Sequence, residues 1–410
     1  MRGEAVSKLK YWIWLSGCTS VSPNTKKLLL DFYGDAEAVF NAPPGDYAKH
    51  EGITRAEAET LEKRDMSRVD DILERCGADN IRIITLADSA YPERLKSIYA
   101  PPAVLYIKGT LPDIDDCPAV AVIGTRKASP YGLKMGKTLS YEICRCGGAV
   151  VSGLTAGIDA AAARGALSAD GICIGVLGTS HDLATGSLAK DIAVRGALVS
   201  EYPPGTKPVK AFFRARNRIA SGLSLGVVVV EAPEVSGTRL FVSEAVSQGR
   251  EVFAVPGNAD SQNSAGTIEM IKDGAKTVTQ GWEVMIEFLP HFPEKITIER
   301  DIPLPDFVSD SDEDIRSKHS SSVKKAQKRS APQSGKTPSS TPAKQVPADR
   351  FNALSDVEKS IVEAILTGSV HIDDIIEKTD LSAATVLSRL TILEIKGIIR
   401  REAGSLTVNK

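Results

Sequence analysis

The sequence has 410 residues, a length that predicts two or three domains. Hydrophobic residues make up 42% and charged residues 25%, as in a soluble globular protein, and the net charge of −2 excludes a basic character spread over the whole chain. No apolar run reaches the roughly 18 residues of a membrane span, and Tyr11–Leu15 is too short for a signal peptide, so we expect a cytoplasmic protein.

Residues 1–75 predict a small helical domain. Apolar residues at 28–30 and 39–40 supply helix faces that pack inward, and the Pro-Pro-Gly sequence at 43–45 separates the helices. A further helix is expected from about Thr54 to Glu74, with Thr54 as its N-cap. This pattern by itself indicates no function.

Residues 76–290 alternate short apolar runs with helix-like segments. Apart from Arg82 and Thr85 in the first of them, the runs are apolar throughout, which is typical of strands covered on both faces. They are Ile81–Leu86, Val104–Ile107, Ala119–Ile123, Ala149–Val151, Ile172–Leu177, Ala197–Val199, Gly226–Val230 and Val252–Val255. We therefore predict a Rossmann-like α/β fold with a doubly wound, mostly parallel sheet.

Residues 291–350 are predicted to be a disordered basic linker. Between Ile315 and Ala348 there are eight Lys or Arg, eight Ser and four Pro, and no Asp or Glu. Such a segment has too little apolar surface to offset the entropy lost on folding. It acts either as a plain tether or as a tether that also makes weak phosphate contacts.

Residues 351–410 predict a winged-helix domain. Ser355 can cap a first helix, residues 372–378 form a short second helix, and Val386, Leu390 and Leu393 share one face of a third. A hairpin over 398–408 follows, which completes the helix-turn-helix variant with a wing. The third helix begins with Ala-Ala-Thr rather than base-reading side chains, which favours an accessory role over duplex recognition.

Two segments follow predicted strands and suit an anion. Gly124 permits close backbone approach, Thr125 adds a hydroxyl, and Arg126 can bind a phosphate with its guanidinium fork. Ser152 and Gly153 open a second loop that leads into a helix. The alternatives are a plain turn with a surface arginine, and a helix start at which Asp159 has a structural role. No G-x-G-x-x-G sequence supports a dinucleotide site.

The segment from 207 to 218 is the strongest signal for nucleic acid. It contains basic residues and no acid, with two phenylalanines between them, and cations with aromatic rings suit the phosphates and bases of a single strand. Its basic residues are Lys207, Lys210, Arg214, Arg216 and Arg218. The alternative is that Phe212 and Phe213 belong to the core and the cations to a solvated face.

A fourth segment, Ser236 and Gly237, is either a phosphate nest or an ordinary N-cap. No catalytic set and no metal-ligand spacing is found: His181 is interpreted as a loop residue. The six cysteines include no Cys-x-x-Cys pair, which indicates reduced, mostly buried thiols. We expect no metal and no cofactor.

The ordered motifs of the chain resemble those of the DprA/Smf family, and the resemblance extends over nearly its whole length. The motifs that carry it are Tyr91-Pro92, Pro101-Pro102, Ile123-Gly124-Thr125-Arg126, Ser152-Gly153-Leu154, Gly157-Ile158-Asp159, Ser200-Glu201-Tyr202-Pro203, Arg216-Asn217-Arg218-Ile219, Glu231-Ala232, Ser236-Gly237, Gly249–Gly257 and Asp273-Gly274-Ala275.

The resemblance implies a protein that binds and protects incoming single-stranded DNA in natural transformation and helps to load the RecA recombinase. It implies a SAM-like helical domain at the N-terminus and a homodimer formed through the Rossmann-like domain. It also places DNA phosphates at one set of residues: Gly124, Thr125, Arg126, Ser152, Gly153, Arg216, Asn217 and Arg218. The sequence departs from the family pattern at Ala163, 181–185 and 238–242, which bears on a small-anion pocket there.

We therefore predict a non-enzymatic protein that binds single-stranded DNA and RecA. Two alternatives stay open. One is a nucleotide-cleaving phosphoribohydrolase of the LOG type, for which Glu244 would be the catalytic residue. The other is a ligand-sensing regulator that binds duplex DNA through residues 351–410.

Overall fold

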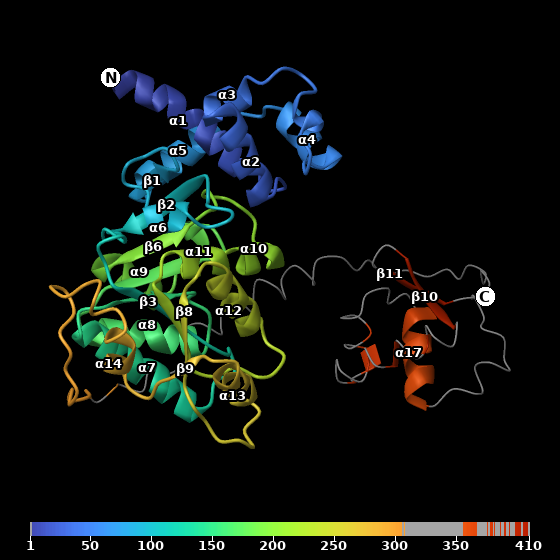
Figure 1. Cartoon of the computed structure of the whole chain (residues 1–410). Helices are drawn as coiled ribbons and strands as arrows, with labels where there is room; N and C mark the ends of the chain where they lie inside the picture. Colours follow the sequence, from blue (N-terminus) through green and yellow to red (C-terminus); the bar gives the residue numbers. More distant parts are fainter. Residues whose placement is uncertain are drawn as a thin grey trace, which may run out of the picture. The chain divides into compact units, whose positions relative to one another are not determined.

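The computed structural model describes two units of the chain, Met1–Gln327 and Lys328–Lys410, which are treated separately (Figure 1). The described residues are 2–305, 307, 356–366, 375, 378–379, 381, 386, 389–390, 393, 398–402 and 405–408. In this part of the chain, no helix combines the length and the apolar run that crossing a bilayer requires.

Helical segments open the first unit. They are α1 (Arg2–Gly17), α2 (Pro23–Tyr33), α3 (Ala36–Phe40), η1 (Tyr47–Lys49), α4 (Arg55–Glu62) and α5 (Val69–Ala78). Thr54 caps α4 as predicted, within a capping box with Glu57. The single helix expected over 54–74 is wrong, because the chain turns at Arg64, whose φ is +46°, and α5 starts afresh at Val69.

A sheet of nine strands lies at the centre of the first unit. Its spatial order is β1-β2-β6-β5-β4-β3-β7-β8-β9, with every pair from β6 to β9 parallel and the β1–β2 and β2–β6 pairs antiparallel. The strands are β1 (Ile81–Thr85), β2 (Val104–Gly109), β3 (Ala119–Ile123), β4 (Ala149–Ser152), β5 (Cys173–Leu177), β6 (Ala197–Ser200), β7 (Gly226–Val229), β8 (Glu251–Ala254) and β9 (Lys276–Thr277). The predicted doubly wound, mostly parallel sheet is confirmed.

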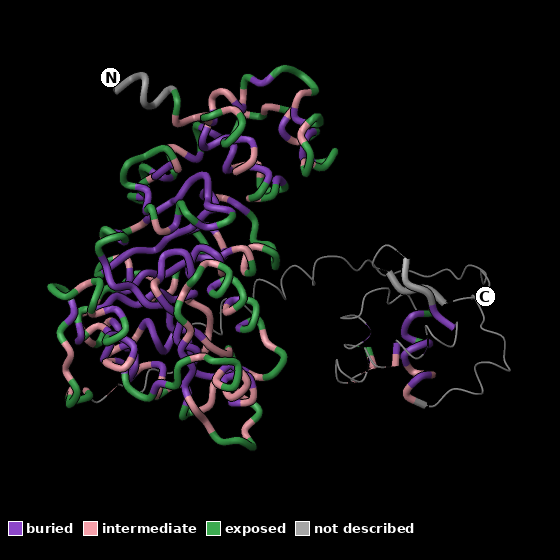
Figure 2. The backbone as a smooth tube through the Cα atoms, in the orientation of Figure 1, coloured by how far each residue is buried: buried purple, intermediate pink, exposed green. Residues whose placement is uncertain are grey.

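Helices cover both faces of this sheet, so β2 to β7 are almost entirely buried (Figure 2). One face packs against α6 (Glu93–Lys96), α11 (Asn217–Gly222), α12 (Gly237–Ser247) and α13 (Ala265–Lys272). The other packs against α7 (Pro130–Arg145), α8 (Ile158–Ser168), α9 (Ser187–Arg195) and α14 (Gly281–Met285). Strand residues that point alternately to the two faces join two separate apolar clusters, as both-sided burial requires.

The helical segment shares a third apolar cluster with the antiparallel edge of the sheet. Tyr106 and Val104 of β2 and Ile81 of β1 pack in the same cluster as Ile13 and Leu29 of the helices. The hydroxyl of Tyr106 also lies 2.7 Å from the Oγ of Ser16. The helices therefore seal this edge of the sheet, as Figure 1 shows.

The chain continues to pack against the sheet after α14. Ile296 is 4% exposed and joins the cluster of Met285 and Phe288, with Phe292 and Ile302 packed beside it. Ordered packing therefore extends past residue 290, where the sequence predicts the linker to begin. Residues 308–350 of that predicted linker lie outside the described residues.

The second unit has its own small core. Helix α17 (Asp356–Leu366) and the antiparallel strands β10 (Ile399–Glu402) and β11 (Ser405–Val408) form its described elements. Val386, Leu390 and Leu393 are buried together with Ile361 of α17, in agreement with their predicted common face. The predicted second helix and the cap at Ser355 lie largely outside the described residues.

Candidate nucleic-acid interface

The topology of the sheet reverses at β3. Strand β3 lies between β4 and β7, and the helix after β3 packs on one face while the helix after β7 packs on the other. The chain therefore leaves β3 and β7 toward opposite faces of the sheet, while the loops that follow the two strands stay in contact through the N–H of Thr125 and the carbonyl of Glu231. Doubly wound proteins bind their ligands at such a switch point.

The loop after β3 begins with a glycine for steric reasons. A Cβ on Gly124 would lie 2.6 Å from Ile158 Cγ1 and 2.8 Å from the carbonyl oxygen of Glu231. The N–H of Thr125 donates to that same oxygen at 2.8 Å, and the side chain of Arg126 is exposed. Among the described residues, Arg126 has no hydrogen-bond or ion-pair partner, so its guanidinium is free for an anion.

The loop after β4 uses its polar groups internally. The hydroxyl of buried Ser152 donates to the carbonyl of Asp159 at 2.8 Å and accepts from the N–H of Leu154 at 3.1 Å. Leu154 has a left-handed φ of +52° and Gly157 one of +83°. A Cβ on Gly157 would lie 2.4 Å from the carbonyl oxygen of Thr125, so the two loops are in contact.

Arg216 lies beneath these loops at the junction of α10 (Lys210–Ala215) and α11. It is 4% exposed, and its Nη1 donates to the carbonyl of Gly153 and, at 2.8 Å, to that of Val176. Burial lowers the pKa of Arg216, the buried carboxylate of Asp159 opposes that shift, and Arg126 adds to it. Arg216 thus joins the ends of β4 and β5 and lies close to the exposed Arg126.

Asp159 is a structural acid at the start of α8, as the alternative interpretation of that segment has it. Its carboxylate is 6% exposed and accepts from the hydroxyl of Thr155 at 2.9 Å. Burial raises the pKa of Asp159, while the positive charge of Arg216 acts in the opposite direction. The acid therefore partly balances the buried arginine.

Arg218 is placed differently from the prediction of a surface phosphate contact. Its Nη2 donates to both carboxylate oxygens of Glu201, at 2.7 and 2.8 Å, and the two side chains are 9% and 8% exposed. A buried and paired guanidinium is not presented to a polyanion at the surface. The structure thus gives Arg218 a contact between β6 and α11 in the core.

Exposed cations line α10 and the segment before it. Lys207, Lys210 and Arg214 are all exposed, while Asn217 is half-buried. Phe212 stacks on Tyr202 with ring centroids 3.9 Å apart and an angle of 18°, and a Cβ on Gly178 would lie 2.8 Å from Phe213. Because Tyr202 and Gly178 follow β6 and β5, α10 crosses the carboxyl ends of these strands.

The fourth segment lies at the start of α12, with Gly237 exposed and the Oγ of Ser236 buried. Ser236 is the N-cap, and its Oγ has no hydrogen-bond partner among the described residues. A Cβ on Gly237 would meet nothing within 4 Å. Glu244, the catalytic candidate of the enzyme alternative, is exposed on the same helix.

Glu231 is a site residue to which the sequence analysis assigned no role. It follows β7, is 2% exposed, and accepts hydrogen bonds from the N–H and hydroxyl of Ser129 at 2.9 and 2.5 Å. The sequence does point to Glu231, because it directly follows a run of four valines, 227–230. A charged residue at the end of a buried strand is rarely left unpaired.

Other candidate groups lie elsewhere. His181 is buried, with Nε2 2.8 Å from the carbonyl oxygen of Tyr106. The described part of the chain contains no cluster of three His, Cys, Asp or Glu that could hold a metal ion. The cysteines in it are all free thiols, as expected.

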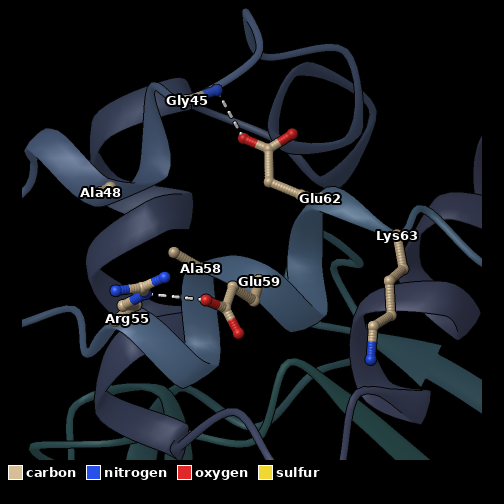
Figure 3. A pocket seen from close by; sticks show the side chains of 7 residues that line it. All are labelled: Gly45, Ala48, Arg55, Ala58, Glu59, Glu62 and Lys63. Atoms are coloured by element: carbon tan, nitrogen blue, oxygen red, sulfur yellow. Dashed lines mark hydrogen bonds and ion pairs between the residues drawn. The ribbon is translucent and has the colours of Figure 1, made fainter.

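A pocket of about 520 Å³ lies on the helical segment, between α4 and the turn at Gly45 (Figure 3). Three of its polar side chains are paired, Arg55 with Glu59 and Glu62 with the N–H of Gly45, and Lys63 lines it as well. This pocket is formed by residues 45–63 of the helical segment. It is not part of the rim of the sheet, by which we mean the loops and α10 at the carboxyl ends of the strands.

A doubly wound sheet with a cationic carboxyl rim, followed by a separate unit of helix and hairpin, defines a Rossmann-like α/β protein with an appended winged-helix domain. The family model for DNA recombination-mediator protein A matches residues 82–289, and that for the DprA winged helix domain matches residues 341–405. The chain belongs to the DprA/Smf family.

Individual relatives agree with this assignment. DNA processing protein DprA of Bacillus subtilis is 41% identical over 211 residues, which cover 50% of this chain and 71% of that protein. Protein Smf of Synechocystis is 34% identical over 282 residues, covering 67% and 71%. The X-ray structure of DprA from Streptococcus pneumoniae matches with a TM-score of 0.60 and 31% identity, over 68% of this chain and 97% of that one.

Proposed function

We propose that this chain takes part in DNA processing by binding single-stranded DNA along the carboxyl rim of its sheet. The observation that carries the proposal is the row of exposed cations at that rim, Arg126 after β3 and Lys207, Lys210 and Arg214 along α10. No acid occurs between Lys207 and Arg218. The family and the names of the relatives support a role in DNA processing.

The chemistry of the rim favours a single strand. Exposed cations follow a flexible phosphate backbone without reading base edges, so binding has little sequence preference. Phe212 rests on Tyr202, which holds its ring in one orientation, and a fixed ring is a platform on which a splayed base can stack. Gly237 faces open space and lets the backbone of a strand approach closely, whereas a Cβ on Gly124 or Gly153 would meet atoms of the protein itself.

We further propose that the DNA-bound chain is a homodimer formed through the Rossmann-like domain and that it delivers single-stranded DNA to RecA. In this proposal the chain acts without metal, cofactor or catalysis. Two buried residues stabilise the loops of the rim: Arg216 donates to the carbonyl of Gly153, and Ser152 donates to the carbonyl of Asp159.

The double variant Arg126→Ala with Lys210→Ala tests the site. It should lower affinity for an oligothymidylate, because two phosphate contacts are lost, and reduce the log–log salt slope by about 1.4, at about 0.7 per phosphate. Fluorescence anisotropy across a salt series measures both, and RecA assembly on the same strand should fall in parallel.

Arg195→Ala is the matched control. Arg195 ends α9 at the opposite end of the sheet, where it pairs with Asp170 at 2.6 Å. This variant should bind like the native chain. An unaltered affinity and slope in the double variant would show that the site lies elsewhere.

A further inference from the structure

A buried carboxylate holds the loop that carries Arg126. Glu231 is 2% exposed, and its carboxylate accepts the N–H of Ser129 at 2.9 Å and the hydroxyl of Ser129 at 2.5 Å. Asn263 adds a third donor, with its Nδ2 3.3 Å from Glu231 Oε2. Three donors satisfy this acid, which has no cationic partner within ion-pair distance in the part of the chain that the structure describes.

The carboxylate lies directly against the first turn of α7. Ser129 is the N-cap of this 16-residue helix and accepts the N–H of Gly132 at 3.0 Å. A Cβ on Gly132 would lie only 2.3 Å from Glu231 Oε2, so a side chain there would collide with the carboxylate. The start of a helix after the first strand at a switch point is where doubly wound proteins hold a ligand phosphate.

Glu231 and Asn263 also hold both sides of Arg126. On one side the N–H of Thr125 donates to the carbonyl of Glu231 at 2.8 Å. On the other, Asn263 Nδ2 donates to the carbonyl of Lys127 at 3.0 Å. The backbone is thus held on both sides of Arg126, whose side chain is exposed and makes no hydrogen bond or ion pair within the described part of the chain.

We propose that Glu231 is a positioning residue: its carboxylate takes the place of a bound phosphate at the start of α7 and so fixes the loop that presents Arg126 to a phosphodiester. This inference rests on the proposed function, because it concerns the same rim. The inference also gives a reason why the rim binds a polynucleotide rather than a free nucleotide. The internal acid fills the position of a nucleotide phosphate, and only the outer side of the loop is left to bind an anion.

Glu231→Ala in the full chain is the test, with acetate as a chemical substitute. The change removes a CH₂–COO⁻ group, which acetate matches in size and charge. The variant should bind oligothymidylate about tenfold more weakly, the equivalent of one charged hydrogen bond. Sodium acetate, compared with sodium chloride at equal ionic strength, should restore most of that loss.

Glu142→Ala is the matched control. Glu142 is also a buried acid at a helix start, since it is 9% exposed and accepts the N–H of Gly281 at the beginning of α14 at 2.5 Å. It lies about 20 Å along α7 from Ser129. This variant should lose stability, keep its DNA affinity and show no response to acetate.

The outcomes separate the two proposals. Native affinity in Glu231→Ala, or weak binding that acetate leaves unaltered, would overturn the role of Glu231. If Glu231→Ala does not fold, Asn263→Ala keeps the acid and removes the bonds from Asn263 to Glu231 and to Lys127, and it must then weaken binding for the inference to stand. Failure of the proposed function appears instead as unaltered binding in the Arg126 and Lys210 double variant.

Discussion

Two arginines that lie two positions apart show how partners decide the role of a side chain. Arg216 donates to backbone carbonyls and keeps its charge close to the rim, whereas Arg218 is neutralised by Glu201 within the core. Hydrogen bonds to carbonyls leave the positive charge of the guanidinium in place, and the nearby carboxylate of Asp159 balances it only in part. We therefore expect Arg216 to add to the potential that attracts a polyanion even though it is buried.

His181 makes stability depend on pH between neutral and mildly acidic conditions. Burial lowers the pKa of His181 from its ordinary 6.5, and its Nδ1 is buried without a hydrogen-bond partner among the described residues. The unfolded chain therefore takes up a proton near pH 6.5 that the folded chain refuses. Stability should fall below that pH, by at most about 1.4 kcal/mol per pH unit.

Urea unfolding at pH 7.0 and 5.5 checks this dependence. His181→Gln removes the titrating group and should lose less stability than the native chain between the two pH values. Equal losses in the two proteins would assign the dependence to other groups.

The chemistry of the site residues can be predicted from the sequence, but their exposure cannot. The basic run 207–218 marks α10 and its flanks correctly. The burial of Arg216 and Arg218 depends on contacts with Gly153 and Glu201, 63 and 17 positions earlier. The chain also changes from α10 to α11 at Arg216, so no single helical period assigns these arginines to a face.

Among the elements, α2 and α4 share one acid at their starts. Burial by itself would raise the pKa of Glu57, but the N–H groups of Ser22 and Thr54 and the hydroxyls of Thr54 and Thr25 donate to it and hold its pKa at about 2. The ionised acid therefore stabilises the fold above pH 4.5. That contribution is lost as the pH falls from 4.5 through 2.

Glu57→Gln should lower the free energy of unfolding at pH 7 by about 1–2 kcal/mol, since an amide accepts fewer of these bonds. The difference from the native chain should shrink between pH 5 and pH 3, because the unfolded native chain then binds a proton. Thermal unfolding across this range measures it. A difference that stays constant would contradict the role of the charge.

The strands were predictable because apolar runs mark burial on both faces, and each of the eight runs overlaps a strand of the sheet. The ninth, β9, has only Lys276 and Thr277, which are both exposed at the sheet edge, so no apolar run signals it. The break between α4 and α5 was missed because Arg64, unlike glycine, gives no sequence sign of a left-handed turn.

At the scale of the whole molecule, the stability of a truncated chain depends on the residue at which it ends. Ending it after Phe307 keeps Phe292 and Ile296 on the core, whereas ending it after Leu289 removes both and exposes Met285 and Phe288. The shorter chain should lose on the order of 3 kcal/mol of stability, the worth of two large apolar side chains. The longer one should keep native stability and the native salt slope for single-stranded DNA.

Urea unfolding and anisotropy on both shortened chains decide between these expectations. Both truncated chains lack the second unit, so comparison with the full chain shows what that unit contributes. A marked loss of salt dependence after the cut at Phe307 would assign phosphate contacts to residues beyond it.

The position of β3 between β4 and β7 has a consequence for synthesis. During translation β4 is synthesised soon after β3, whereas β7 follows only about a hundred residues later. The strands β5 and β6 and the basic segment 207–218 are synthesised in between. Until β7 is synthesised, the backbone N–H and C=O groups on one side of β3 lack their native partner and can pair with a strand of another chain. A chaperone that shields short valine-rich segments would find its most exposed target during that interval.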